Sequence, residues 1–271
     1  MALVKFNFES QYLGNNHTIG IILPDKPRDV EPKDFYDRNK KYKVLWLLHG
    51  TFGDYSDWIR KSMIELYACE NDLIVVMPSA MNSIYENWPD FGLGFNMWDY
   101  FFEELMPVVY NWFPASDKRE DNFIAGLSMG GRGTAKFVCG HPEKFAAAAV
   151  LSSSPRDLRA AVESGPDRRM MNDIKRAGSV ESYLESPENT WDHFTELAGT
   201  GRLPRLYFCC GEDDGALENF RKFEAYAKEI GLDATFETEP GYRHEWRFWD
   251  LYIQKALLFF GLDKNAAGNP F

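Results

Sequence analysis

The chain has 271 residues, 45% of them hydrophobic and 15% aromatic, which is enough for one large domain with a sizeable core. Its formal net charge of −11 excludes broad contact with nucleic acid phosphates or an anionic membrane, and no basic stretch offsets that charge. No run is apolar and long enough to span a bilayer, and the amino terminus does not resemble a secretion signal, so we expect a cytoplasmic protein without membrane contact.

The first fifty residues predict a hairpin, a surface loop and one central strand. Residues 3–24 alternate apolar and polar side chains about a turn, which is typical of an antiparallel hairpin, and His17 beside that turn is expected to be solvated. Residues 24–41 are rich in proline and charge and predict a surface loop. The uninterrupted apolar run 44–48 is typical of a central parallel strand, and a loop beginning at His49 follows its carboxyl end.

Helices and buried strands alternate in the next segment. The pattern predicts a helix over 58–68, a buried strand over 72–77 and a strongly apolar helix over 98–112. A long loop rich in aromatic residues, 79–95, connects the last two elements. A short buried strand over 122–125 follows.

A serine between two glycines comes directly after that strand. Gly126, Ser128 and Gly130 form the pattern G-x-S-x-G, and the residues behind it predict a helix. Such a turn strains the serine backbone, and glycine removes the clashes that side chains two residues away would cause. The helix directs free N–H groups at Ser128, which favours the negative charge of an attack on a carbonyl. Alone, the pattern is equally consistent with a glycine-rich turn or a serine at a helix N-cap.

The alternation of strands and helices indicates βαβ units. It predicts an α/β protein with a mainly parallel central sheet and helices on both faces. Charged, helix-like residues 155–200 interrupt the alternation before strands over 206–210 and 234–238 resume it. We expect 155–200 to be a surface excursion or a small lid inserted in a single domain over 1–271. In such sheets ligands bind beyond the carboxyl ends of the strands, where Ser128 is placed.

Candidate partners of Ser128 follow the last two predicted strands. A serine hydroxyl needs a base, which an imidazole supplies best at neutral pH, and the imidazole needs an acid to orient it. The order along the chain is Ser128, three consecutive acids at 212–214, then His244, which is the order that the α/β-hydrolase fold requires. A solvated acidic turn and a loop histidine are the alternatives; among the acids we select Asp214. His49 follows an early strand, where backbone amides serve better as oxyanion donors.

Four motifs that together span most of the chain resemble a known family. They are Gly126-Leu127-Ser128-Met129-Gly130-Gly131, His49-Gly50-x-x-Gly53 with Trp58 beyond it, Cys210-Gly211-x-x-Asp214, and Gly241-x-x-His244-x-Trp246-x-x-Trp249. Together they look like the tributyrin esterase group of the esterase D-like α/β-hydrolases. Relatives in the wider group include S-formylglutathione hydrolases and esterases that release acetyl or feruloyl groups from plant polysaccharides.

The resemblance implies an α/β-hydrolase fold and a serine carboxylesterase for short acyl chains that needs no cofactor. It supports the acid at Asp214, which matches the position of the family's acid. His-Gly stands at 49–50 where formylglutathione hydrolases tend to have Ser-Gly-Leu, which argues against that activity. A feruloyl or acetyl esterase for plant-polysaccharide substrates remains the main alternative.

These residues predict an acyl-enzyme mechanism. Ser128 attacks an ester carbonyl while His244, oriented by Asp214, takes its proton. The backbone N–H groups of Met129 and Thr51 are expected to hold the oxyanion, with Phe52 as the second choice for the latter. The expected partner is a small-molecule ester, and a homo-oligomer stays open.

The remaining side chains predict the lining of the pocket and argue against a metal. Three aromatic residues of the 79–95 loop are expected to line the alcohol or acyl side, although packing explains them equally well: Tyr85, Trp88 and Phe91. The cysteines lack metal-ligand spacing and are expected to be buried free thiols: Cys69, Cys139, Cys209 and Cys210.

Three other functional classes are alternatives to ester hydrolysis. An acyltransferase would use the same three residues and differ only in the acceptor that reaches the acyl-enzyme. A binding module on a decayed hydrolase fold usually lacks one of the three residues, and here all three are present. A peptidase is also compatible with the fold, but the chain has no extra domain to gate a peptide.

Overall fold

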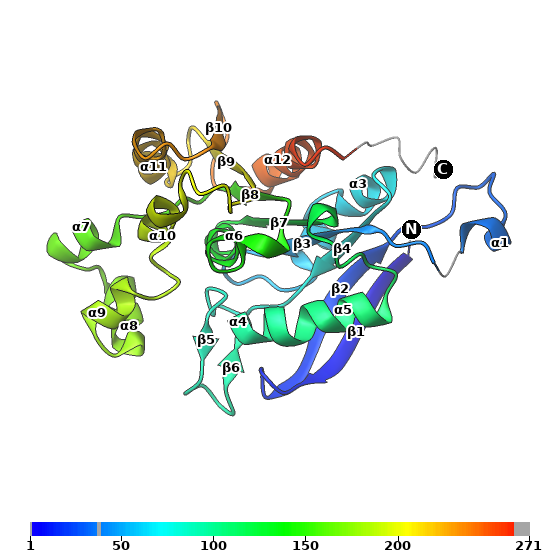
Figure 1. The fold of residues 1–271 in the computed structure, drawn as a ribbon, viewed down its shortest axis with the longest axis horizontal. Coiled ribbons are helices and arrows are strands. Elements are labelled where there is room, and N and C mark those ends of the chain that lie inside the picture. Colours follow the sequence, from blue (N-terminus) through cyan, green and yellow to red (C-terminus); the bar gives the residue numbers. More distant parts are fainter. Residues whose placement is uncertain (1, 37–38, 263–271) are drawn as a thin grey trace.

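Apolar runs along the chain pair into one central sheet in the computed structural model, which describes residues 2–36 and 39–262 (Figure 1). Its eight strands lie in the spatial order β1 (Ala2–Ser10), β2 (Asn15–Leu23), β4 (Leu73–Met77), β3 (Lys43–Leu48), β7 (Asn122–Leu127), β8 (Ala147–Leu151), β9 (Arg205–Gly211) and β10 (Ala234–Glu239). β2 pairs antiparallel with β1 and β4, whereas the other six strands of this sheet are parallel to one another: β4, β3, β7, β8, β9 and β10. The predicted α/β fold with a mainly parallel sheet is confirmed.

Helices cover both faces of the sheet, so the inner strands are apolar on both sides. In β3, Trp46 and Leu48 belong to one core, and Leu45 and Leu47 belong to the other. The first core is closed mainly by α5 (Met106–Trp112), α6 (Met129–Gly140), α10 (Thr190–Leu197) and α11 (Leu217–Glu229). The second core is closed by α3 (Ile64–Glu70) and α12 (Trp246–Phe259). This arrangement directs the carboxyl ends of the parallel strands toward one edge of the molecule.

The helix predicted over 98–112 is continuous but not regular. It begins as α4 (Met97–Asp99), widens into a π-helical turn over Tyr100–Leu105 and continues as α5. Pro107 has no N–H to bond the carbonyl four residues before it, so the hydrogen-bond ladder shifts to the wider spacing there. Side-chain periodicity alone does not reveal such a shift.

Short elements occur where the sequence predicted loops or one longer helix. They are α1 (Pro32–Phe35), α2 (Asp57–Lys61), β5 (Asn87–Trp88) and β6 (Phe95–Asn96). Extended backbone at Ser62 separates α2 from α3, so the helix predicted over 58–68 is two helices. β5 and β6 form a small antiparallel hairpin within and just beyond the aromatic loop.

His17 is buried, so the expectation that it is solvated is wrong. The β1–β2 ladder reaches from Ala2 and Leu23 to Ser10 and Asn15, which places His17 inside a strand rather than in a turn. Its ring lies against Tyr100, at 5.1 Å between centroids. Burial lowers the pKa of His17 to about 4.

The charged region 155–200 folds into helices beside α6 (Figure 1). It contains α7 (Leu158–Glu163), α8 (Arg168–Ala177), α9 (Val180–Leu184) and α10, between β8 and β9. The first three helices share a small apolar cluster of their own, formed by Leu158, Ala161, Met170 and Tyr183. α10 instead joins the main core through Phe194, which attaches the region to the sheet domain.

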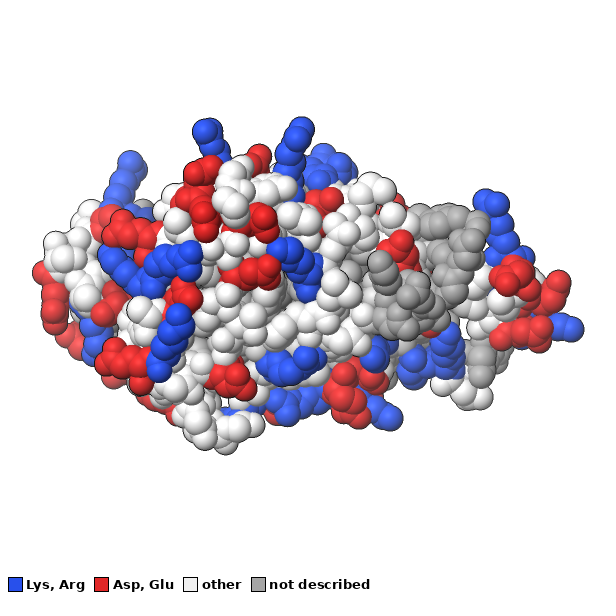
Figure 2. Space-filling model, turned by 90° about the horizontal axis from the view of Figure 1, so that it is seen from above, with Lys and Arg blue, Asp and Glu red and all other residues white. Residues whose placement is uncertain are grey.

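Charges of both signs are interspersed over the surface, as Figure 2 shows for one face. Within residues 2–36 and 39–262, no helix combines the length and hydropathy needed to cross a bilayer. The cysteines are free thiols, and three of them are buried as expected, whereas Cys139 is half-buried.

Candidate active site

The turn between β7 and α6 holds Ser128 in a strained backbone conformation. Ser128 has φ 52° and ψ −115°, a region that residues other than glycine rarely adopt. A Cβ atom at Gly126 would collide with the backbone of Gly130, and one at Gly130 would collide with the carbonyl of Leu48. Glycine at 126 and 130 is therefore a steric requirement of this turn, as the sequence predicted.

His244 lies between Ser128 and Asp214, within hydrogen-bonding distance of both. The Ser128 Oγ is 2.9 Å from His244 Nε2, and His244 Nδ1 is 2.9 Å from Asp214 Oδ2. An ionised carboxylate only accepts, so Nδ1 carries the proton and Nε2 is left to accept from the Ser128 hydroxyl. The structure thus brings together the three residues that the sequence selected from separate segments.

Two adjacent strand ends bring the acid and the histidine together. The loop after β10 bonds to the loop after β9, since Asp213 N–H donates to the Tyr242 carbonyl at 2.9 Å. A side chain at Gly211 would collide with the Tyr242 backbone, so glycine permits this close approach. The ring of His244 then packs edge-on against Trp249, at 5.1 Å between centroids.

Asp214 is buried but keeps a lowered pKa. Burial alone would raise the pKa of this carboxyl, but hydrogen bonds from His244, from the Ala216 N–H at 2.8 Å and from Ser152 outweigh it. The carboxylate is therefore charged at neutral pH, as a group that stabilises an imidazolium must be.

Trp249 fixes Ser152, and Ser152 in turn stabilises the Asp214 carboxylate; the sequence analysis missed both interactions. The Trp249 indole N–H donates to Ser152 Oγ at 2.9 Å, and the Ser152 hydroxyl bonds to Asp214. Ser152 follows β8 and has φ 49°. Trp249 belongs to one of the four recognised motifs, but nothing in the sequence pairs it with Ser152.

The loop after β3 lies beside Ser128 and forms a tight turn. Gly53 N–H donates to the Gly50 carbonyl at 3.2 Å, and Phe52 has φ 63°. Phe52 N–H donates to Asn82 Oδ1 at 2.9 Å, so the second-choice oxyanion donor already has a partner. Thr51 lines the cavity that contains Ser128, and Met129 begins α6, whose first N–H groups lack intrahelical partners.

His49 supports this loop and is not placed to act as a base. Its Nε2 accepts from the Ala80 N–H at 2.8 Å, so its Nδ1–H donates to the Gly50 carbonyl at 2.7 Å. Both ring nitrogens are thus used in bonds to the backbone. Burial lowers the pKa of His49 and keeps the ring neutral.

A cavity of about 350 Å³ opens beside Ser128. Besides Thr51, Met129 and His244, the lining comes from the end of β8, from α6, from the region 155–200, and from Ala216 and Asn219 at the start of α11. No group of three or more His, Cys, Asp or Glu side chains suited to a metal ion occurs within 2–36 and 39–262.

The three aromatic residues expected in the pocket do not line this cavity in the described part of the chain. Tyr85 is fully buried, and its hydroxyl donates to the His49 carbonyl at 3.0 Å. Trp88 lies under the Arg176 guanidinium, and Phe91 is exposed in the loop between β5 and β6. The packing alternative therefore holds for Tyr85 and Trp88, because the hairpin turns their loop away from Ser128.

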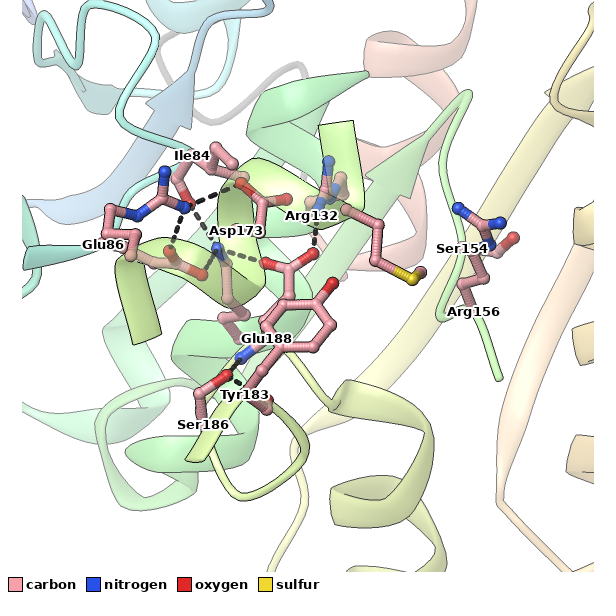
Figure 3. A network of polar contacts seen from close by, with 12 residues as sticks. Ile84, Glu86, Arg132, Ser154, Arg156, Asp173, Tyr183, Ser186 and Glu188 are labelled. Atoms are coloured by element: carbon pink, nitrogen blue, oxygen red, sulfur yellow. Dashed lines mark hydrogen bonds and ion pairs between the residues drawn. The ribbon is translucent and has the colours of Figure 1, made fainter. Parts of the chain in front are cut away.

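Charged side chains form a buried cluster between α6 and the 155–200 region (Figure 3). Lys136 donates to Glu188 at 2.8 Å and to Glu86 at 3.0 Å, and Arg132 also pairs with Glu188. Arg176 joins the cluster through Glu86 at 3.2 Å and Asp173 at 2.9 Å. We call these six residues the charge cluster: Glu86, Arg132, Lys136, Asp173, Arg176 and Glu188.

The chain is similar to known proteins over nearly its whole length. The sequence model of the family described as "Putative esterase" matches residues 10–259. An acetyl esterase of Caldicellulosiruptor saccharolyticus is 33% identical, with 95% of this chain and 97% of that protein covered. Two solved Staphylococcus aureus structures, a fluorophosphonate-binding serine hydrolase and an S-formylglutathione hydrolase, have TM-scores of 0.79 and 0.77. Both are 31% identical, with 96% of this chain and 98% of theirs covered.

These matches confirm the recognised group, since the family, the acetyl esterase and the solved structures agree with it. The argument from His-Gly at 49–50 against S-formylglutathione as a substrate stays a prediction. The chain therefore belongs to this esterase family and is a serine ester hydrolase with the α/β-hydrolase fold.

Proposed function

We propose that the protein is a carboxylesterase that hydrolyses esters of short acyl groups through Ser128, His244 and Asp214. The observation that carries the proposal is the pair of 2.9 Å contacts that joins the Ser128 oxygen to His244 and His244 to Asp214. A serine hydroxyl is a weak nucleophile unless a neighbouring base removes its proton, and this series provides such a base.

The reaction passes through an acyl-enzyme. Ser128 Oγ bonds to the carbonyl carbon as its proton moves to His244 Nε2, and the Asp214 carboxylate stabilises the imidazolium that results. His244 then gives the proton to the departing alkoxide, which leaves as the alcohol. Water repeats the sequence on the acyl-enzyme, with His244 again the base, and releases the carboxylic acid and free Ser128.

Backbone N–H groups are the expected donors to the oxyanion. Met129 at the start of α6 and Thr51 after β3 flank Ser128, and one such donor lowers the barrier by roughly 3–4 kcal/mol. Phe52 is the weaker candidate because Asn82 occupies its N–H.

Acetyl is the acyl group that we favour. The acetyl esterase relative supports it, and a cavity of about 350 Å³ is near the lower limit for small-molecule pockets. Release of acetyl groups from plant-polysaccharide fragments would use the same residues and differ only in the alcohol. Acyl transfer stays a second candidate, which competing alcohols in the product analysis distinguish.

The test is hydrolysis of acetyl, butyryl, octanoyl and feruloyl esters by the wild type and by Ser128→Ala. We expect acetyl and butyryl esters to be cleaved and the alanine variant to lose about 10⁴-fold or more in kcat. A fluorophosphonate probe should label the wild type and not Ser128→Ala, whereas Ser182→Ala, which changes an exposed serine on α9, should behave as the wild type. Undiminished hydrolysis by Ser128→Ala would overturn the proposal.

A further inference from the structure

The cavity beside Ser128 is more charged than a neutral alkyl ester requires. Pockets for small molecules are mostly apolar, with a few polar groups that fix orientation. This cavity is lined by seven charged side chains: Arg132, Lys136, Arg156, Asp167, Arg169, Asp173 and Glu188. A purely alkyl substrate would displace water from these groups without replacing its hydrogen bonds.

The charge cluster accounts for most of these groups. Arg132 and Lys136 both pair with Glu188, and Asp173 pairs with Arg176 at 2.9 Å. Lys136 is 1% exposed, and Glu188 is also buried. The side chains in these pairs are therefore held by each other and are not free to bind a substrate. A ligand charge must therefore be met by the side chains that remain.

Two arginines remain, on different elements of the cavity wall. Arg169 lies on α8, and within 2–36 and 39–262 its side chain has no acidic partner in an ion pair. Arg156 lies on the loop that follows β8, apart from the charge cluster and near Ser154 (Figure 3). Arg156 pairs with Asp167 at 3.3 Å, but both side chains are about half exposed, and such pairs contribute little.

Asp167 has a second role that limits its hold on Arg156. Its carboxylate is the N-cap of α8 and accepts from the Met170 N–H at 2.9 Å. A substrate carboxylate could therefore take the Arg156 guanidinium without leaving Asp167 unpaired.

The charge balance in the cavity also favours an added anion. The pKa of Arg132 is lowered, first by burial and then by the positive charge of Arg169 nearby. The two guanidinium groups line the same cavity and repel each other, although Arg169 is exposed and solvent weakens this repulsion. A bound carboxylate would relieve that repulsion and accept the paired N–H groups of an arginine fork.

We propose that this esterase acts on esters that carry a carboxylate, and that Arg169 and Arg156 bind that carboxylate in the cavity next to Ser128. This inference rests on the proposed esterase function and names its substrate class. The protein carries a net charge of −11, so attraction of an anionic substrate depends on these local cations rather than on the overall field.

The test compares matched pairs of esters that differ by one carboxylate. Monoethyl succinate and ethyl butyrate place a carboxylate or a methyl group at the end of the same acyl chain. 4-Acetoxybenzoate and its methyl ester place the difference on the leaving group. For each ester, kcat and KM are measured with the wild type, Arg169→Gln, Arg156→Gln and the double variant. Arg168→Gln is the matched control, because it removes the same charge from the neighbouring residue of α8, which does not line the cavity.

We expect the wild type to prefer the carboxylated member of at least one pair, which identifies the side of the ester that carries the anion. Arg169→Gln should lower kcat/KM for that member about 10-fold or more through KM, with the neutral partner unchanged and Arg168→Gln without effect. Arg169→Lys should recover part of the loss. Preference for the neutral member of both pairs, or a ratio unchanged in the double variant, would overturn the proposal while leaving the esterase function in place. Failure of the esterase function itself would show as no hydrolysis of any ester.

Discussion

Three residues around the catalytic serine hold backbone conformations that side chains rarely adopt. Ser128, Phe52 and Ser152 have φ of 52°, 63° and 49°. Each such conformation costs on the order of 1–3 kcal/mol and persists only where surrounding contacts fix it. Ser128 and Ser152 line the cavity, and Phe52 follows Thr51, which also lines it. These three of the seven non-glycine residues with positive φ in 2–36 and 39–262 thus lie where the positions of a nucleophile, an oxyanion donor and the support of an acid are decided.

Ser152→Ala tests the support of Asp214. The change removes one of the hydrogen bonds that keep the pKa of Asp214 low, so this pKa should rise toward its ordinary value. A carboxylate with a higher pKa stabilises the imidazolium of His244 more strongly, so protonation of this base, and with it the loss of kcat on acidification, should begin at higher pH than in the wild type. At neutral pH we expect kcat to fall roughly 10-fold with little change in KM. A pH profile of kcat against the wild type is the measurement.

The same substitution leaves the buried Trp249 indole N–H without its acceptor, which costs about 1–3 kcal/mol of unfolding free energy. Ser152→Cys keeps a small side chain with a weak hydrogen-bonding group and avoids the β-branch that φ 49° disfavours, so it serves as the conservative control. If stability falls in Ser152→Ala but kcat declines on acidification over the same pH range as in the wild type, Ser152 has a structural role only.

Single residues were predictable from the sequence where a motif fixed their place on the chain. Ser128, Asp214 and His244 each follow a strand end, so the topology of the sheet decides their meeting. Tyr85 was misplaced because an aromatic residue in a loop has the same pattern whether it lines a pocket or fills the core. Ser152 has no pattern at all, since its role arises only when β8 and α12 come together.

Secondary-structure elements with strong periodicity were predicted, and exceptions have local causes. The π-helical turn before α5 comes from a missing N–H at Pro107. The break between α2 and α3 lies at Ser62, whose hydroxyl bonds the Trp58 carbonyl at 2.6 Å. The helices of 155–200 were expected, but the ion pairs that join this region to α6 come from Glu188 in the turn between α9 and α10, and spacing along one chain does not report such pairs.

Glu188→Gln tests whether the charge cluster fastens this region to α6. Removing the anion leaves Lys136 and Arg132 buried with less compensation, and breaking a buried pair in this way costs about 3–5 kcal/mol. Because the region lines the cavity, KM should rise more than kcat falls. Chemical denaturation, limited proteolysis and steady-state kinetics measure these effects.

Glu185→Gln is the matched control for that experiment, because it removes an exposed carboxylate from the same region. Its stability and KM should stay within error of the wild type. If Glu188→Gln matched this control in both measurements, the cluster would not hold the region in place.

Two buried histidines link the stability of the whole molecule to pH. His17 and His49 lie on neighbouring sides of the Ser79–Ala80 segment; Ser79 faces His17, and the Ala80 N–H donates to His49. The pKa of His17 is lowered to about 4, first by burial, and that of His49 is lowered for the same reason. Both rings are therefore neutral in the folded protein at a pH where the unfolded chain is protonated.

The sign of the effect follows from which state binds the proton. Between pH 6.5 and about 4 the unfolded chain takes up a proton at His17 that the folded protein does not, so acidification favours unfolding. One such proton changes the free energy of unfolding by about 1.4 kcal/mol per pH unit. Above pH 6.5 His17 is neutral in both the folded and the unfolded chain, so it no longer makes the free energy of unfolding depend on pH.

His17→Phe should therefore flatten the pH dependence of stability. The phenyl ring suits the aromatic surroundings at Tyr100 and Phe95. The substitution also removes a buried nitrogen, His17 Nε2, that has no hydrogen-bond partner among the residues that the structure describes. Between pH 7 and pH 5 the variant should lose about 2 kcal/mol less than the wild type, measured from urea denaturation at both values. His17→Gln also removes the titrating group and should flatten the slope equally, whatever its stability at pH 7. Equal slopes in the wild type and both variants would mean that His17 is protonated alike in the folded and unfolded chain, and would remove this link between burial and acid sensitivity.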